Sequence, residues 1–294
     1  MGIFIIDVML LPEWVHHTLR IPYLLKTTKV GRGKTLVFLH GIASFGEIWS
    51  PVVEDLSHNY RCITLDLLGH GDSPKPTHVR YTPQEHLRSI RWTLFWHGVW
   101  GRPIVVGHSM GALLATHWAS THPRAIERLV LVAMPIYESR SSDSGKKRLE
   151  GLVDAGYLLF YRALRATPQR WAIRSAKALL RRSPNLVGQA TLNEATWYPV
   201  VSSLQNTIEL QTTGTDIKQL PEELPITVLY GTLDQLVLAN NLKRAFLGRP
   251  HTRIIRVMVP HELTARYCRA VVRAIKTKED PWYTALNMKI GSRK

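Results

Sequence analysis

Short apolar runs recur along the chain and alternate with stretches of helical periodicity. The runs are rich in leucine and β-branched residues, which is typical of strands buried on both faces of a sheet. They span residues 35–39, 62–65, 104–106, 129–132, 226–230 and 254–258. Residues 14–25, ahead of Gly31-Arg32-Gly33, are further predicted to form an antiparallel strand pair. Strands that alternate with helices indicate an α/β fold with a mostly parallel central sheet flanked by helices.

A long interval without a strand pattern separates the fourth run from the fifth. Pro135 and the polar stretch 139–145 mark an exit from the sheet, and residues 146–211 then follow a helical pattern. Thr213-Gly214-Thr215 returns the chain toward the sheet. We therefore predict one core domain, formed by residues 1–136 and 216–294, with residues 137–215 inserted as a helical lid.

The composition permits a sizeable buried core, because 45% of the 294 residues are apolar. The chain carries 38 Lys and Arg against 22 Asp and Glu, a formal charge of +16. That excess is compatible with acidic substrates, anionic membrane surfaces or nucleic acid as partners. No helix-turn-helix, zinc-finger or RNA-binding motif accompanies the charge, so we predict no nucleic-acid partner.

The spacing of the cysteines and the length of the apolar segments indicate the cellular compartment in which the protein is expected. Cys62 and Cys268 lie far apart with no C-x-x-C spacing, which argues against a zinc cluster or a disulfide framework and fits a reducing environment. The apolar stretch 1–11 contains Asp7 and lacks a basic start and a small-residue cleavage site, so we do not predict a signal peptide. No run approaches the roughly 20 apolar residues of a membrane span. We therefore expect a cytoplasmic protein, and no sequence feature indicates its oligomeric state.

The strongest local motif is Gly107-His108-Ser109-Met110-Gly111, a G-x-S-x-G pattern between a predicted strand and a helical pattern. A sharp strand-to-helix turn needs glycines around its central residue, because a Cβ there would meet neighbouring backbone. The turn raises the Ser109 hydroxyl above the sheet, next to a helix N-terminus that favours developing negative charge. We predict Ser109 as a nucleophile; the plain alternative is a chance Gly-Ser turn.

A serine nucleophile needs a base and an acid at the ends of later strands. His261 follows the last apolar run and is the predicted base, whereas His251 precedes that run and belongs at the opposite end of the sheet. Asp234 follows the fifth run and is the predicted acid. Glu138, after the fourth run, is the alternative acid, and a surface role is the alternative for either carboxylate.

The order Ser109, Asp234, His261 with its glycine turn resembles the α/β-hydrolase superfamily. Two more segments resemble it: His40-Gly41-Ile42, like the family's oxyanion loop, and the segment Asp66 to Ser73, like its D-x-x-G-x-G-x-S loop. The resemblance implies that the backbone N–H groups of Ile42 and Met110 form the oxyanion hole and that His40 shapes its loop. It also implies acyl transfer without a metal or an organic cofactor.

The serine at the turn disfavours the dehalogenases and epoxide hydrolases of the superfamily, which use aspartate there. The loop His40 to Gly46 lacks both the Pro-Gly of the ring-cleavage C–C hydrolases and the tandem glycines of H-G-G-G lipases. We therefore expect a serine hydrolase that cleaves a small-molecule carboxylic ester, or a related carbonyl substrate, through an acyl-enzyme. A C–C bond or lactone hydrolase is the alternative within the fold. A non-catalytic binding protein is the alternative outside enzymes, and the complete triad argues against it.

Two stripes at helical spacing lie outside these motifs. Trp92, Trp96 and Trp100 recur every four residues ahead of the nucleophile strand, and we expect them to pack in the core. The predicted lid carries a basic stripe on one helix face, formed by Arg170, Arg174, Lys177 and Arg181. This stripe is either a solvated face or a surface that draws anionic substrates or an anionic membrane toward the lid.

Overall fold

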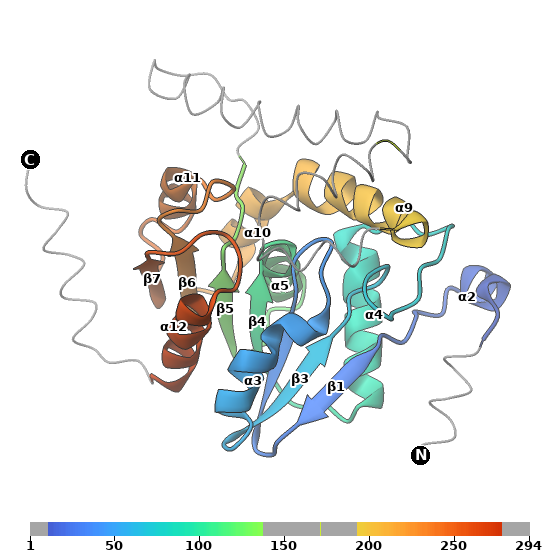
Figure 1. The fold of residues 1–294 in the computed structure, drawn as a ribbon, viewed down its shortest axis with the longest axis horizontal. Helices are drawn as coiled ribbons and strands as arrows, with labels where there is room; N and C mark the ends of the chain where they lie inside the picture. Colours follow the sequence, from blue (N-terminus) through green and yellow to red (C-terminus); the bar gives the residue numbers. More distant parts are fainter. Residues whose placement is uncertain (1–10, 138–170, 172–192, 278–294) are drawn as a thin grey trace, which may run out of the picture.

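The computed structural model describes residues 11–137, 171 and 193–277. These residues form a seven-stranded sheet with helices on both faces (Figure 1). The strands are β1 (Thr27–Val30), β2 (Lys34–Leu39), β3 (Tyr60–Leu65), β4 (Ile104–His108), β5 (Arg128–Val132), β6 (Ile226–Gly231) and β7 (Thr252–Val257). Their order in the sheet is β1-β3-β2-β4-β5-β6-β7, and only the β1–β3 pair is antiparallel. The predicted α/β class and mostly parallel sheet are confirmed.

The described helices cover the sheet in two layers. They are α2 (Glu13–Leu19), α3 (Ser50–Leu56), α4 (Pro83–Trp96), α5 (Met110–Thr121), α9 (Glu194–Ser203), α10 (Thr213–Gln219), α11 (Ala239–Ala245) and α12 (Ala265–Lys276), with a 3-10 helix η1 (Gly46–Trp49) and a π-helix η2 (Leu204–Glu209). Helices α3 and α12 contact each other on one face, and α5 contacts α4 and α10 on the other. Among the described residues no helix has the length and apolar character needed to cross a membrane.

The core lies where the central strands are covered on both sides. Strands β2, β4, β5 and β6 are almost entirely buried, whereas the edge strands β1 and β7 are largely exposed or half-buried. Each of the six apolar runs overlaps a strand. The runs on β2, β4, β5 and β6 match strands with two covered faces, which need apolar residues at successive positions.

The predicted strand pair over residues 14–25 is wrong. Helix α2 occupies the first part of this segment, beginning after Pro12 with Glu13 in its first turn, where a negative charge favours a helix. The buried ring of His16 stacks on Tyr23 at 3.9 Å, and its Nδ1 lies 2.9 Å from the carbonyl oxygen of Ile21. These contacts fold the segment back on itself. The antiparallel strand is instead β1, whose Thr-Thr-Lys-Val sequence has the β-branched composition of a strand.

The expectation that three tryptophans pack in the core is also wrong. Trp92 and Trp96 are half-buried, and Trp100 is 68% exposed. Helix α4 ends at Trp96, and Gly98 then takes a positive φ of 69°, so the four-residue spacing does not continue on one helix face. Trp100 therefore lies on a surface loop.

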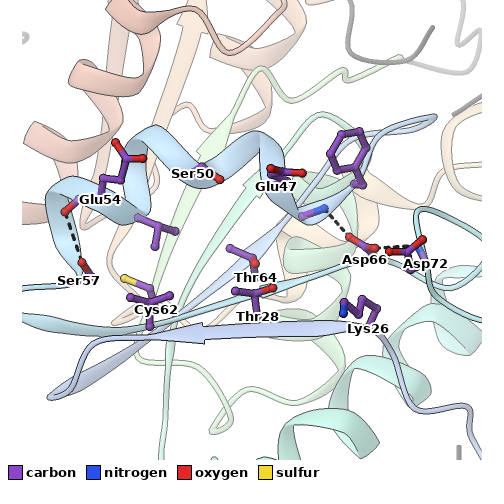
Figure 2. A pocket seen from close by; sticks show the side chains of 14 residues that line it. Lys26, Thr28, Glu47, Ser50, Glu54, Ser57, Cys62, Thr64, Asp66 and Asp72 are labelled. Carbon is purple, nitrogen blue, oxygen red and sulfur yellow. Dashed lines mark hydrogen bonds between the residues drawn. The ribbon is translucent and has the colours of Figure 1, made fainter. Parts of the chain in front are cut away.

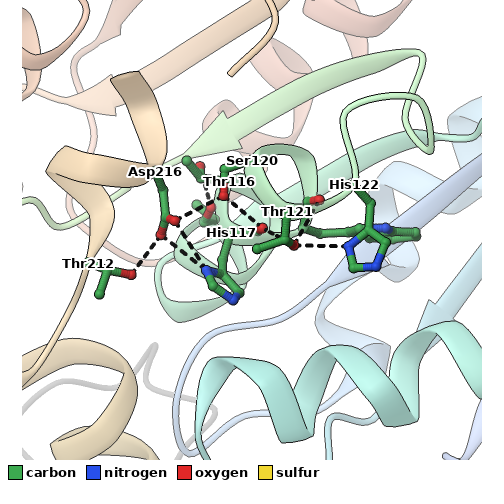
Figure 3. A network of polar contacts seen from close by, with 9 residues as sticks. Thr116, His117, Ser120, Thr121, His122, Thr212 and Asp216 are labelled. Atoms are coloured by element: carbon green, nitrogen blue, oxygen red, sulfur yellow. Dashed lines mark hydrogen bonds and ion pairs between the residues drawn. The ribbon is translucent and has the colours of Figure 1, made fainter. Parts of the chain in front are cut away.

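Helices α9 and α10, with η2 between them, lie in the interval between β5 and β6. Helix α10 crosses the expected domain boundary at residues 215 and 216, and a buried polar network joins it to α5 (Figure 3). Asp216 accepts hydrogen bonds from Thr212 Oγ1 and Ser120 Oγ, each at 2.9 Å, and its oxygens lie 3.2 Å from His117 Nδ1. The basic stripe from Arg170 to Arg181 and the alternative acid Glu138 lie outside the described residues.

Candidate active site

Ser109 lies at the turn between β4 and α5, in a backbone conformation that L-residues rarely adopt. Its φ is 52° and its ψ is −117°, and its N–H donates to the carbonyl oxygen of Val132 at 2.9 Å. A Cβ on Gly107 would lie 2.4 Å from the Gly111 carbonyl oxygen, and one on Gly111 would lie 2.3 Å from that of Leu39. Both glycines are therefore required by close backbone packing, as the motif predicts.

Ser109, His261 and Asp234 form a continuous hydrogen-bonded chain. Nε2 of His261 lies 3.0 Å from Ser109 Oγ, and Nδ1 lies 2.8 Å from Asp234 Oδ2. A carboxylate only accepts hydrogen bonds, so Nδ1 carries the proton and Nε2 is free to accept the serine proton. This arrangement can activate a serine hydroxyl for attack on a carbonyl carbon.

The Asp234 carboxylate is held by the backbone of its own loop. Its side chain is fully buried, and Oδ1 accepts hydrogen bonds from the N–H groups of Leu236 at 2.8 Å and Val237 at 3.1 Å. The other oxygen thus faces His261, and the bound N–H groups stabilise the negative charge. The loops after β6 and β7 meet closely here, because a Cβ on Gly231 would lie 2.3 Å from the Val259 carbonyl oxygen.

His108 contributes a contact that the sequence analysis missed. Its Nε2–H donates to the backbone carbonyl oxygen of His261 at 2.9 Å, across 153 residues of sequence. Burial lowers the pKa of His108 to about 3, with a smaller effect from the neighbouring His261, so the ring stays neutral. No local sequence signal could have revealed this contact, because it depends on how the β4 and β7 ends meet.

The loop after β2 passes directly over Ser109. A Cβ on Gly41 would lie 3.1 Å from Ser109 Cβ. His40 is fully buried; its Nδ1–H donates to the Gly41 carbonyl oxygen at 2.6 Å, and its Nε2 accepts from the N–H of Leu67 at 2.8 Å. Burial holds the pKa of His40 well below its usual range. A neutral imidazole therefore joins this loop to the loop after β3.

The predicted oxyanion donors belong to the two backbone segments that meet at Ser109, the loop after β2 and the start of α5. Ile42 follows Gly41 in the loop over the serine and is half-buried against the core. Met110 is fully buried and is the first residue of α5. The N–H groups in the first turn of a helix have no carbonyl partner within that helix, so the Met110 N–H is available to a ligand.

Asp66 braces the same loop from the side of β3 (Figure 2). Its Oδ1 accepts from the Gly46 N–H at 2.6 Å and its Oδ2 from the Asp72 N–H at 2.8 Å, while its backbone oxygen accepts from Ser73 Oγ at 2.5 Å. The carboxylate borders a cavity of about 420 Å³ between α3 and strands β1 and β3. Asp66 therefore supports the loop that carries Ile42. The cavity beside Asp66 is not lined by Ser109.

The sequence profile of the alpha/beta hydrolase fold family matches residues 34–261. The chain belongs to the α/β-hydrolase family. The matched range includes the three hydrogen-bonded residues Ser109, Asp234 and His261 and also the loop over Ser109. In this α/β hydrolase, no group of three or more His, Cys, Asp or Glu side chains within the described residues is arranged to hold a metal ion.

Individual relatives of this α/β hydrolase include enzymes named for ester cleavage. The pimeloyl-[acyl-carrier protein] methyl ester esterase of Xanthomonas campestris is 30% identical over 231 residues, covering 78% of this chain and 87% of that protein. The probable lysophospholipase BODYGUARD 2 of Arabidopsis thaliana is 38% identical over 108 residues, covering 35% of this chain and 23% of that protein. The chain thus matches less than a quarter of the plant protein's length.

Solved structures show the same fold at low sequence identity. The enol-lactonase from Burkholderia xenovorans LB400 superimposes with a TM-score of 0.67 and 17% identity, covering 85% of this chain and 94% of that one. At this identity the likeness concerns the fold alone.

Proposed function

We propose that this α/β hydrolase cleaves carboxylic esters through an acyl-enzyme on Ser109. The proposal rests on the chain of contacts in which His261 Nε2 lies 3.0 Å from Ser109 Oγ and Nδ1 lies 2.8 Å from Asp234. Folding alone requires none of these three side chains in this arrangement. The relatives named as esterase and lysophospholipase support an ester as the substrate class.

In the first half-reaction His261 takes the proton of Ser109 as Oγ attacks the ester carbonyl carbon. The negative charge that develops on the carbonyl oxygen is stabilised by the N–H groups of Ile42 and Met110. Asp234 stabilises the imidazolium form of His261. The imidazolium then protonates the departing alcohol, and the acyl group remains on Ser109.

In the second half-reaction His261 takes a proton from water, and the resulting hydroxide attacks the acyl carbon. The same two N–H groups stabilise the second oxyanion. Collapse releases the carboxylic acid, and His261 returns the proton to Ser109. No metal or organic cofactor takes part in either step of the proposed reaction.

We further propose that residues 137–215 form a lid over this site, inserted between core segments 1–136 and 216–294. The support comes from α9, which lies beyond the carboxyl ends of the strands (Figure 1). It packs closely on the loop after β3, since a Cβ on Gly69 would lie 2.5 Å from Pro199 Cβ. A lid there would shape the acyl and alcohol pockets.

The test combines a substrate panel with a serine-directed probe. Wild-type protein should hydrolyse p-nitrophenyl esters of some chain length, and a fluorophosphonate should label it once, at Ser109. Ser109→Ala should keep the fold and lose about three or more orders of magnitude in kcat, because only the oxyanion donors and binding remain. Circular dichroism of the variant provides the control for folding.

Four outcomes would contradict the proposal. Labelling at another residue, or a Ser109→Ala variant that keeps most of its activity, would exclude the mechanism. Turnover of a lactone or a vinylogous diketone in place of simple esters would move the chain to the alternative hydrolase classes. Absence of both labelling and turnover would favour a non-catalytic binding protein.

A further inference from the structure

Four aromatic rings gather around the C-terminal end of α4, and two of them are largely exposed. Phe95 is 46% and Trp100 is 68% exposed, and their ring centroids lie 4.6 Å apart. Trp92 and Trp96 complete the group, with centroids 5.9 and 6.0 Å from Phe95 and 5.7 Å from each other. We name these residues the aromatic cluster. Contiguous exposed apolar surface of this kind marks an interaction site.

Positive charge surrounds the aromatic cluster. Arg88 and Arg91 are exposed and lie seven and four residues before Phe95, on the same face of α4. Arg61 donates hydrogen bonds to the carbonyl oxygens of His97 and Gly98, in the loop that carries Trp100. Burial, then the charges of Lys29 and Arg61, lower the pKa of His97 in the same loop.

Negative charge is missing from the same stretch of the chain. Residues 86–126 contain no Asp or Glu. The Glu127 carboxylate is paired with Lys34 at 2.5 Å. The aromatic cluster therefore has a basic border, and a partner with anionic groups complements it.

The aromatic cluster lies at the end of the sheet opposite the candidate active site, as the course of α4 indicates (Figure 1). Helix α4 connects β3 to β4, so its C-terminal end lies where β4 begins, whereas Ser109 follows the end of β4. The cluster is therefore no part of the substrate pocket.

We propose that the aromatic cluster and its basic border bind the headgroup region of an anionic lipid bilayer. Indole rings favour the membrane interface, because the ring is apolar and its N–H is hydrated. A phenyl ring inserts on the apolar side of the same interface. Trp100 is 68% exposed, so its indole N–H can donate to phosphate or ester oxygens. The arginines add attraction to anionic lipid. Bound in this way, the protein holds its catalytic site away from the bilayer and takes substrate from the aqueous phase.

Two other occupants fit the aromatic cluster less well. A second copy of the chain would bring two basic borders face to face, which like charges oppose. Single-stranded nucleic acid stacks its bases on open ring faces. Here Phe95 meets Trp96 and Trp100 at interplanar angles of 89° and 78°, and Trp92 stacks against Phe95 at 7°, so the rings pack on one another.

The test is co-sedimentation of the full chain with vesicles. Wild-type protein should bind phosphatidylcholine vesicles that contain about one-third phosphatidylglycerol and should bind pure phosphatidylcholine much less, with the difference shrinking in high salt. Phe95→Ala with Trp100→Ala should lower partitioning by about tenfold or more, because two rings no longer enter the interface. Arg91→Gln should lower it by about fivefold.

Trp14→Ala is the matched control, because Trp14 is also 68% exposed but stands beside Glu13 in α2 and makes none of the cluster's ring contacts. It should partition like wild type. Hydrolysis of a water-soluble p-nitrophenyl ester, if present, should be equal in all variants, and the vesicle assay needs no turnover, so the two proposals fail separately.

Four results would overturn the proposal. Wild-type protein that ignores anionic vesicles excludes it, and a double variant that binds like wild type assigns the binding to another surface, such as the basic stripe from Arg170 to Arg181. Wild-type dimers that dissociate in the double variant, measured by sedimentation velocity, indicate a second copy. Binding of a labelled single-stranded oligonucleotide that the double variant loses indicates nucleic acid.

Discussion

Lowering the pH from 7 to 5 should destabilise the folded protein through four buried imidazoles. Burial is the main cause in each: it lowers the pKa of His70 to about 4 and of His86 and His108 to about 3, and holds that of His40 well below its usual range. An unfolded histidine titrates near 6.5. In the window between those values the unfolded chain binds protons that the folded chain does not.

The sign and the size of the effect follow from proton linkage. Stability rises with pH wherever the unfolded state binds more protons, so it is complete above about pH 6.5 and is lost as the pH falls toward 4. Each imidazole with these values contributes a loss of about 2 kcal/mol between pH 7 and pH 5. His70, His86 and His108 together give a loss on the order of 6 kcal/mol, and His40 adds to it in the same direction. This loss is comparable with the whole stability of an ordinary domain, about 5–15 kcal/mol.

The assay is urea unfolding followed by tryptophan fluorescence at pH 7, 6 and 5. His86→Leu removes one buried imidazole outside the serine site, so its free energy of unfolding should change by about 2 kcal/mol less than that of wild type over this range. His58→Leu is the matched control, since the His58 side chain is exposed. An unfolding free energy of wild type that stays constant from pH 7 to pH 5, or a His86→Leu variant as acid-sensitive as wild type, would refute the reasoning.

The remaining predictions concern the serine site. His108→Phe should lower kcat roughly tenfold by releasing the His261 backbone, while His108→Gln, which keeps a donor, should retain most of it; equal losses would contradict a positioning role. Gly111→Ala should lose about 3 kcal/mol or more of stability, because its Cβ would lie 2.3 Å from a β2 carbonyl oxygen, and an unchanged melting temperature would oppose this. Asp234→Asn should lower kcat by about 10⁴-fold and Glu138→Gln should not; the reverse order would move the acid to the end of β5.

Several features of this protein follow from its sequence by local rules. The apolar runs of the central sheet become strands because a strand covered on both faces needs consecutive apolar side chains. The glycines around Ser109 specify the turn because backbone approaches within 2.4 Å of an added Cβ. Asp234 and His261 are brought to Ser109 because parallel strands end at one edge of the sheet, so residues just beyond those ends lie close together.

Only the tertiary structure decided the features that depend on surroundings. Residues 14–25 fold back on themselves through the packing of His16 on Tyr23, a contact that local propensity does not encode. Trp100 is exposed because the chain turns at Gly98 after α4 ends, although its spacing suggests a helix face. His108 holds His261 across 153 residues, and this contact exists only once the strand ends are assembled. Sequence patterns predict which side chains are buried. Packing between distant segments determines which residues those side chains contact.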